Sequence, residues 1–440
     1  MSVRFSQQRH EVNLWVVPLK MSIAALLLFG VTVTLDTLAA GHIIHLPDWF
    51  TMGGIDDARA ILGAMLGCVS TVLALIFSVA LLVLSMVANL FGPRLLYRFV
   101  QDWVTQVCIG LFMGAFIYVF LVFLVTHKDD HSSFIPQVSL ITSWLVVLSA
   151  FAFLVFYSHR VAVLIQNPDA VGRIVDDLRQ CVHQQRSLPT GARLREREHA
   201  TVDLVDENDA AAVRSSSSGY LQTIDHTALI RAAARADAHV TFSFRPGQFV
   251  LEGETIALVA PSSADPALQR LIRRSVTLGR HRVLFQDLEF GVAQIVEIAI
   301  RALSPAVNDT FTGVACVDLL GEALTVLAEA PYCDGRYFDA NGNARLQVPP
   351  LLIDRLVKQA FDQIRQAAVD NPAVIIRLLS TTGRLAARFT DEGDRRSLLE
   401  QANAVWETAT SKALVKMDYE DIDAARRKAL DTITATNRVS

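Results

Sequence analysis

The chain has 440 residues, of which 52% are hydrophobic and 19% are charged, and its formal net charge is −4 at pH 7. Soluble domains are typically about 45–50% apolar and about 25% charged, so the composition excludes a disordered chain or a coiled-coil rod and argues against an ordinary soluble enzyme. The acidic balance also argues against a nucleic-acid partner, which requires a basic excess.

The apolar residues are concentrated in the first third of the chain. Four stretches there, 16–39, 61–91, 103–126 and 137–158, are almost free of charge. Each is long enough to cross a bilayer, which takes about 20 apolar residues. The first stretch lacks a clean small-residue cleavage site, so we treat it as a retained helix. The sequence therefore predicts a transmembrane domain of four helices over residues 1–160.

The basic residues predict the orientation of these helices. The lysines and arginines that would share one side of the membrane are Arg4, Arg9, Lys20, Arg94, Arg98, Arg160, Arg173 and Arg179. The other two loops hold only Arg59 and Lys128, beside several aspartates. Because short basic loops stay in the cytoplasm, both termini are expected there.

The second predicted span carries a polar stripe, formed by Thr71, Ser78, Ser85 and Asn89. At about 100° per residue, these side chains fall within roughly 40° of one direction. Small residues four apart also occur on this helix, a spacing that lets helix backbones approach closely. The stripe is interpreted either as a helix-packing face, with its hydroxyls bonded to the preceding turn, or as the lining of a water-filled path.

Asp36 is the only acidic residue well inside a predicted span. An ionisable group in a span suggests function, although Asp36 lies near the outer end, where it could also reach headgroup water. Two outer loops contain His42, His45, His127 and His131. Imidazoles beside carboxylates could bind a transition metal, but solvated loop residues are the preferred interpretation, and we expect no metal or cofactor.

The remaining chain is expected to form a juxtamembrane helix and linker over 161–218 and a cytoplasmic α+β domain over 219–440. The segment GYLQTID reads as a strand, with Asp225 positioned to cap a helix at 226–237. Strand patterns at 239–259 predict a small β module that resembles the lipoyl and biotinyl half-barrels. Those carriers need a modified lysine, which this segment lacks. The part that follows is predicted to be mostly helical, with apolar stripes typical of a core or subunit contact.

Polar residues gather around one predicted helix of this domain: Arg280, Arg282, Asp287, Glu297, Arg301, Ser304, Asn308 and Asp309. Such groups must be paired if they are buried. Three interpretations are open: a structural network that holds the turn between two helices, a ligand or anion site using Arg280, Arg282 and Arg301, or a catalytic site. The sequence contains no phosphate-binding loop or hydrolase motif, so we expect no enzyme.

Four stretches give the chain a family resemblance: NLFGPRLLYRFVQD from Asn89, GYLQTID from Gly219, RPGQFVLEG from Arg245 and RALSPAVND from Arg301. They resemble a bacterial family of predicted multi-pass membrane proteins, domain of unknown function 2254. The family more often has Gly-Ile where this chain has Ala306 and Val307, and proline where it has Thr310. The resemblance covers most of the chain and implies a bacterial inner (plasma) membrane location, but it implies no activity.

Together these features predict an α-helical membrane domain joined to a cytoplasmic α+β domain with a helical C-terminal part. The first functional hypothesis is an oligomeric channel- or transporter-like protein. It would be a homo-oligomer in the lipid bilayer, and its cytoplasmic domain would gate the path. The alternative is a membrane-anchored sensor or scaffold without transport activity.

Overall fold

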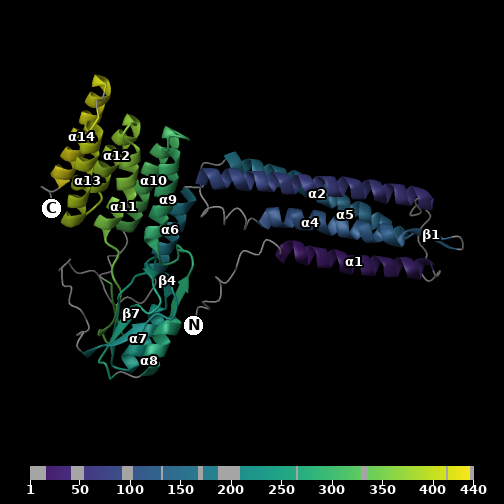
Figure 1. The fold of residues 1–440 in the computed structure, drawn as a ribbon, viewed down its shortest axis with the longest axis horizontal. Coiled ribbons are helices and arrows are strands. Elements are labelled where there is room, and N and C mark those ends of the chain that lie inside the picture. Colours follow the sequence, from purple (N-terminus) through teal and green to yellow (C-terminus); the bar gives the residue numbers. More distant parts are fainter. Residues whose placement is uncertain are drawn as a thin grey trace. The chain divides into compact units, whose positions relative to one another are not determined.

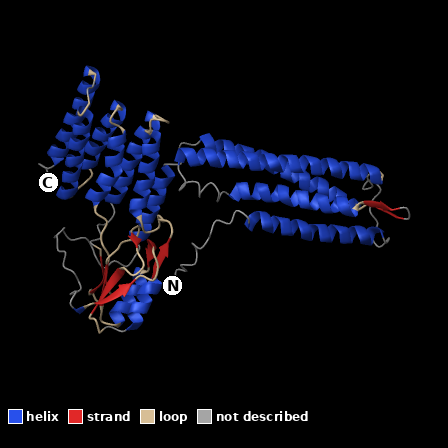
Figure 2. Cartoon of the chain, in the orientation of Figure 1, coloured by secondary structure: helices blue, strands red, loops and turns tan. Residues whose placement is uncertain are grey.

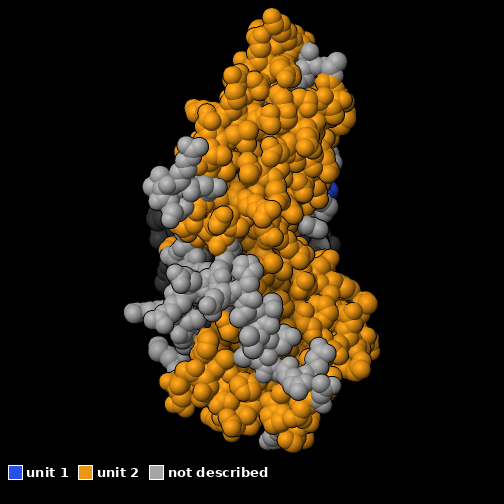
Figure 3. Space-filling view, turned by 90° about the vertical axis from the view of Figure 1, so that its left-hand side faces the viewer, with its two compact units in different colours: residues 1–167 blue, residues 168–440 orange. Residues whose placement is uncertain are grey.

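The computed structural model describes residues 16–40, 54–91, 103–129, 132–166, 172–186, 209–263, 266–328, 335–412 and 415–436. The chain divides into an N-terminal unit, residues 1–167, and a C-terminal unit, residues 168–440. Figure 3 shows one face of the C-terminal unit in orange. The border lies a few residues beyond the expected end of the transmembrane domain at residue 160.

The N-terminal unit is helical (Figures 1 and 2). Its elements are α1 (Val16–Ala40), α2 (Ile55–Phe91), α4 (Trp103–Val125), α5 (Gln137–Gln166) and a hairpin of β1 (His127–Asp129) and β2 (Ser132–Phe134). Helix α4 packs against α1, α2 and α5. Because α1, α2 and α5 keep many large apolar side chains exposed, their outer faces suit contact with lipid.

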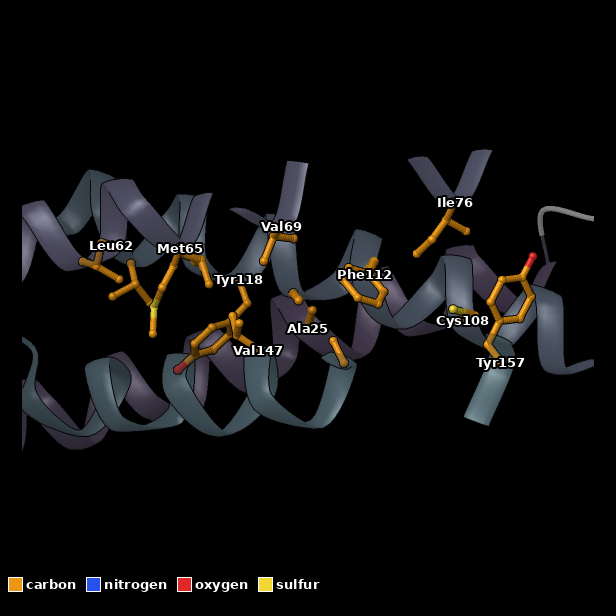
Figure 4. Close-up of a cluster of buried hydrophobic side chains, with 14 of the residues drawn as sticks. Ala25, Leu62, Met65, Val69, Ile76, Cys108, Phe112, Tyr118, Val147 and Tyr157 are labelled. Atoms are coloured by element: carbon orange, nitrogen blue, oxygen red, sulfur yellow. The ribbon is translucent and has the colours of Figure 1, made fainter. Parts of the chain in front are cut away.

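The core of the N-terminal unit lies around α4 (Figure 4). Leu62, Phe112, Tyr118 and Leu140 are fully buried and come from three different helices. All four helices contribute apolar side chains to this core, and the unit also buries polar residues, among them Thr32, Asp36 and Ser139.

Five described helices are long and apolar enough to cross a membrane. Four are α1, α2, α4 and α5, which correspond to the four predicted spans. The fifth is α10 (Thr310–Ala328) in the C-terminal unit, where it packs against α6, α9 and α12. Its Cys316, Val317 and Leu320 are fully buried, so the apolar composition of α10 also serves the interior of a helical array.

The C-terminal unit begins with helix α6 and continues into a β module. Its elements are α6 (Gly172–Arg186), β3 (Ala211–Arg214), β4 (Gly219–Ile224), α7 (His226–Arg235), β5 (His239–Phe242), β6 (Phe249–Val250), β7 (Thr255–Ala260), α8 (Pro266–Ser275), β8 (Val276–Gly279), β9 (Arg336–Phe338) and β10 (Ala344–Gln347). One sheet has the order β3-β7-β5-β10-β9, with only β5 and β10 parallel, and the other has the order β6-β4-β8.

Sequence and structure agree closely at the start of this module. The expected strand is β4, and the Asp225 side chain accepts a hydrogen bond from Ala228 N at 3.0 Å, which caps α7. The two strands expected between 245 and 259 join different sheets, because β6 pairs with β4 whereas β7 pairs with β3 and β5.

The remaining helices form a two-layer array (Figure 1). They are α9 (Leu288–Ala302), α10, α11 (Ile353–Ala367), α12 (Pro372–Ala386), α13 (Glu392–Thr410) and α14 (Lys416–Thr436). Helices α9, α11 and α13 pack in sequence as one layer, and α10, α12 and α14 pack as the other. Such stacking of helices is typical of α-solenoids. The apolar stripes expected in α11 and α12 are buried in its core.

Candidate functional site

The polar stripe of α2 lies on the outside of the N-terminal unit. Thr71, Ser78 and Ser85 are all exposed. The Thr71 hydroxyl donates to Gly67 O at 2.8 Å, so its hydrogen-bonding need is met within the helix. Asn89 also belongs to α2, but its side chain lies outside the described part. Within the described part of this unit, Thr71, Ser78 and Ser85 therefore neither pack against another helix nor line an interior path.

Glycines on the same face leave it open for a close contact. A Cβ atom added at Gly63 or Gly67 would meet nothing within 4 Å. Close packing inside the unit uses another glycine pair: a Cβ at Gly110 of α4 would lie 2.7 Å from Met21 Sδ, and one at Gly114 would lie 3.3 Å from Met21 O. The four-residue spacing of Gly110 and Gly114 was the available sequence signal for this α1–α4 contact, which the sequence analysis missed.

Asp36 is buried, with 4% of its surface exposed. Its carboxylate accepts hydrogen bonds from Val138 N at 2.7 Å, Ser139 N at 3.0 Å and Ser139 Oγ at 2.6 Å. These two amides belong to the first turn of α5, where backbone N–H groups have no partner within the helix. Asp36 of α1 therefore caps α5, and the capping carboxylate is matched to the positive end of that helix.

A second set of polar groups lies beside this cap. Tyr118 Oη is 2.9 Å from Thr32 Oγ1 and donates to Ser139 O at 3.4 Å. Thr32, Tyr118 and Ser139 come from α1, α4 and α5, so the cluster connects three helices at one end of the unit. Its groups satisfy one another, which is the requirement for polar side chains buried in an apolar environment. The side chains of His42, His45, His127 and His131, for which solvated loop positions are the preferred interpretation, lie outside the described residues.

In the C-terminal unit, Asp287 is the most deeply buried of the predicted polar residues, with a side chain 1% exposed. Arg282 holds it with two hydrogen bonds, from Nε to Oδ2 at 2.6 Å and from Nη2 to Oδ1 at 2.8 Å. Oδ1 also accepts from Phe290 N at 3.1 Å, which caps α9. Burial raises the pKa of Asp287, while the Arg282 pair and the Phe290 N–H oppose that rise.

Glu289, in the first turn of α9, lies close to further arginines. Arg245 Nη2 donates to Glu289 Oε2, and Arg355 Nε lies 3.5 Å from Glu289 Oε1. The Arg282 guanidinium lies over the Phe290 ring, 5.4 Å from its centroid. We call Arg245, Arg282, Asp287 and Glu289 the junction cluster, because it joins the β module to the helical array.

The junction cluster brings together segments that are distant in the sequence. Gln286 Nε2 donates to Ile224 O at 3.0 Å and its Oε1 accepts from Ile224 N at 2.8 Å, so a side-chain amide continues the edge of β4. Gly247, with φ of +95°, packs directly on the Asp287 carboxylate. The stretches beginning at Gly219 and Arg245 thus meet at the start of α9. Arg245 was not predicted to belong to this site, although the RPGQ stretch that begins with it was the available signal in the sequence.

The turn between α9 and α10 is a separate polar site. Asp309 accepts hydrogen bonds from Thr312 N at 3.0 Å and Thr312 Oγ1 at 2.6 Å, which caps α10 and lowers the pKa of Asp309. Ser304 Oγ donates to Arg301 O at 2.7 Å, and Asn308 has a left-handed φ of 49°. Arg301 lies 3.7 Å from Glu297 one turn earlier. These contacts stabilise the turn itself.

The structure does not bring all the predicted residues together. Arg282 precedes α9 and Arg301 lies in its last turn, so the fifteen residues of the helix separate them by about 20 Å at ~1.5 Å per residue. Arg280 is exposed. An anion site that uses all three arginines is therefore not assembled within this unit. The described residues also contain no cluster of three His, Cys, Asp or Glu side chains that could hold a metal.

His226, the first residue of α7, is a buried titratable group that the sequence did not single out. It is 7% exposed, and its ring centroid lies 4.6 Å from that of Tyr337. Among the described residues, its Nδ1 has no hydrogen-bond partner. Burial lowers the pKa of His226 to about 4, against a weaker opposing effect of Asp225.

The fold and these sites define a class: a membrane protein with several long apolar helices joined to an α+β unit. The chain belongs to the family described as predicted membrane protein (DUF2254), whose model matches residues 11–383. This confirms the resemblance found in the sequence. Helices α13 and α14 lie beyond the matched residues.

Similar proteins occur in mycobacteria. Uncharacterized protein Mb1321c of Mycobacterium bovis and uncharacterized protein Rv1290c of Mycobacterium tuberculosis are each 28% identical over 434 residues, covering 95% of this chain and 80% of the relative. A third, MT1328 of Mycobacterium tuberculosis, is 26% identical over 431 residues. No solved structure matches the chain.

Proposed function

We propose that α1, α2, α4 and α5 cross the inner membrane of a bacterium, with both termini and the C-terminal unit in the cytoplasm. The basic residues that alternate between loops support this orientation. Helix α10 is left out of the membrane in this proposal, because it packs among α6, α9 and α12.

The protein acts as a homo-oligomer in which α2 faces another copy. The observation that carries this proposal is the exposed small-residue face of α2. Gly63 and Gly67 leave open space there, and no helix in the described part of the unit covers Thr71 or Ser78. In a bilayer, small residues favour helix association because they allow close backbone packing and contacts between polar groups.

The best supported activity is that of a channel- or transporter-like protein, whose path runs between copies along Thr71, Ser78 and Ser85. The buried polar side chains of Asp36, Thr32 and Tyr118 are hydrogen-bonded to protein partners, which disfavours a water-filled path through one copy. The C-terminal unit would gate the path, as it follows α5 directly in the chain. The proposal includes no enzymatic activity, cofactor or nucleic-acid partner.

Liposomes containing the purified protein test this activity. Efflux of potassium or chloride is expected from the unmodified protein and should fall strongly for Ser78→Leu, which fills the path with an apolar side chain. Leu148→Phe, on the exposed face of α5, serves as the matched control and should leave efflux unchanged. Absence of efflux of either ion under any applied voltage would contradict the channel proposal.

The second candidate is a membrane-anchored sensor or scaffold. It is favoured by the two-layer array, because α-solenoids commonly present extended binding surfaces. Three turns of this array, which precede α10, α12 and α14, are joined by hydrogen bonds. Asn371 Nδ2 donates to Thr310 Oγ1 at 2.6 Å, and Lys412 Nζ donates to Asp370 Oδ1 at 2.5 Å. A chimera that keeps residues 168–440 behind unrelated spans should retain its cellular function if this candidate is correct, and lose it if the native spans conduct.

A further inference from the structure

The β module carries a basic surface on two neighbouring helices. Arg231 and Arg235 lie on α7, and Arg270, Arg273 and Arg274 lie on α8; we call these five residues the arginine face. All five are exposed, and neither helix contains an aspartate or glutamate. The two helices thus carry five positive charges in a chain whose net charge is −4.

Helix geometry turns all five arginines away from the sheet. On α8, Leu268 and Ile272 are buried in the module core, and at about 100° per residue the three arginines point to the opposite side. The same holds on α7, where Leu229 and Ile230 are buried. The two helices pack against each other, and Asp225 N donates to Ser275 O at 2.9 Å, so the start of α7 lies beside the end of α8. The arginines therefore share one surface.

Other exposed arginines of the same unit lie close to acidic side chains. Arg396 lies 3.8 Å from Glu400 and Arg427 lies 2.8 Å from Asp423. Nearby Asp237 is already paired with Arg345 at 2.8 Å. Within the part of the chain that the structure describes, no ion pair neutralises the arginine face. Unneutralised like charges repel one another, so an anionic partner would lower their energy.

We propose that the arginine face binds the headgroups of anionic phospholipids. Guanidinium groups match phosphate oxygens in geometry and charge, and clusters of four to eight basic residues are typical of anionic lipid surfaces. The chain belongs to a membrane-protein family, and the C-terminal unit is covalently connected to α5, one of the proposed spans. This connection keeps the arginine face close to lipid phosphates. This tether raises their effective concentration without any new contact. The inference does not depend on channel activity.

Hydrogen exchange of the full-length protein in nanodiscs tests the proposal. We expect amides of α7 and α8 to exchange at least fivefold more slowly in discs of mixed phosphatidylglycerol and phosphatidylcholine than in phosphatidylcholine alone, because even one arginine near an anionic surface contributes about fivefold in affinity. High salt should remove the difference.

Two triple variants with the same change in net charge distinguish an effect of the arginine face from an effect of the total charge of the protein. Replacing Arg270, Arg273 and Arg274 by Gln should abolish the dependence on phosphatidylglycerol. Replacing Arg384, Arg396 and Arg427 by Gln, all exposed on the helical array, should preserve it. Circular dichroism checks that both variants fold.

Equal exchange in neutral and anionic discs would overturn the proposal, as would equal loss in both triple variants. Protection of α7 and α8 by inorganic phosphate or an oligonucleotide in neutral discs, without any effect of phosphatidylglycerol, would also overturn it and would assign the surface to a soluble anion.

Discussion

Asp36 and Asp287 are both buried carboxylates, and both cap helices. Asp36 accepts from the first amides of α5 across the N-terminal unit, and Asp287 accepts from Phe290 N at the start of α9. They differ in their partners, since Asp287 is also held by Arg282 whereas the three described bonds of Asp36 come from backbone amides and a hydroxyl. At both positions a charge inside an apolar region has a structural role that composition alone does not indicate.

Asp36→Ala should destabilise the N-terminal unit by about 2–3 kcal/mol, because it leaves two buried amides of α5 without an acceptor. Thr37→Ala is the matched control: Thr37 is the next residue along α1, is exposed and bonds only within its helix. Thermal unfolding in detergent measures both. If the two variants unfold at the same temperature, Asp36 does not have the capping role.

His226 makes the stability of the β module depend on pH. Its pKa falls from an ordinary 6.5 to about 4 in the folded unit. The contribution of the neutral, buried imidazole to folding stability is therefore fully present above pH 6.5. As the pH falls from 6.5 toward 4, the unfolded chain takes up the proton first, and stability decreases by up to about 3 kcal/mol.

Hydrogen exchange of the β module at pH 7 and pH 4.5, corrected for the intrinsic rate, measures this loss. His226→Gln should reduce the difference between the two conditions, whereas His183→Gln, at an exposed histidine of α6, should leave it unchanged. An unchanged pH dependence in His226→Gln would show that another group is responsible.

At the scale of elements, the β module and the array are joined by the junction cluster, and the backbone of Gly247 packs against its Asp287 carboxylate. A Cβ added at Gly247 would lie 2.4 Å from Asp287 Cγ, whereas one at Gly253 would meet nothing within 4 Å. Both glycines have positive φ, +95° and +84°. Substituting alanine at each glycine therefore separates the cost of backbone strain, which both positions share, from the cost of steric contact, which only Gly247 has.

Gly253→Ala should cost about 1–2 kcal/mol of unfolding free energy through its left-handed backbone. Gly247→Ala should cost about 1–3 kcal/mol more, because the added methyl group displaces Asp287 from Arg282. Denaturant unfolding of the full chain, followed in the C-terminal unit, measures the difference. Equal losses would mean that the junction cluster adapts without cost.

Periodicity predicted most elements because it depends on local sequence. The four apolar stretches correspond to α1, α2, α4 and α5, and Asp225 caps α7 as expected. The junction cluster depends on long-range contacts: Arg245 and Glu289 are 44 residues apart, and only the packing of the β module against α9 brings them together. The α2 stripe was identified from spacing, yet its outward direction depends on which helix face Leu62, Met65 and Val69 bury.

At the scale of the whole molecule, the proposed topology places both ends of α10 on the cytoplasmic side. Single cysteines at Val307 and Asn341, before and after α10, should react with a membrane-impermeant maleimide in inverted vesicles and not in intact cells. Helix α10, like α1, is long and apolar enough to cross a membrane, so the labelling decides whether α10 spans the membrane or lies in the cytoplasm. Labelling from opposite sides would mean that α10 spans the membrane and that the four-span topology is wrong.

The central claim is that the exposed face of α2 contacts a second copy in the membrane, and disulfide cross-linking in native membranes tests it most directly. In a Cys68→Ser background, Gly67→Cys and Thr71→Cys should give cross-linked dimers on oxidation. Val155→Cys, on the exposed face of α5, should remain monomeric. Dimers that form equally at Val155, or at none of these positions, would contradict the account.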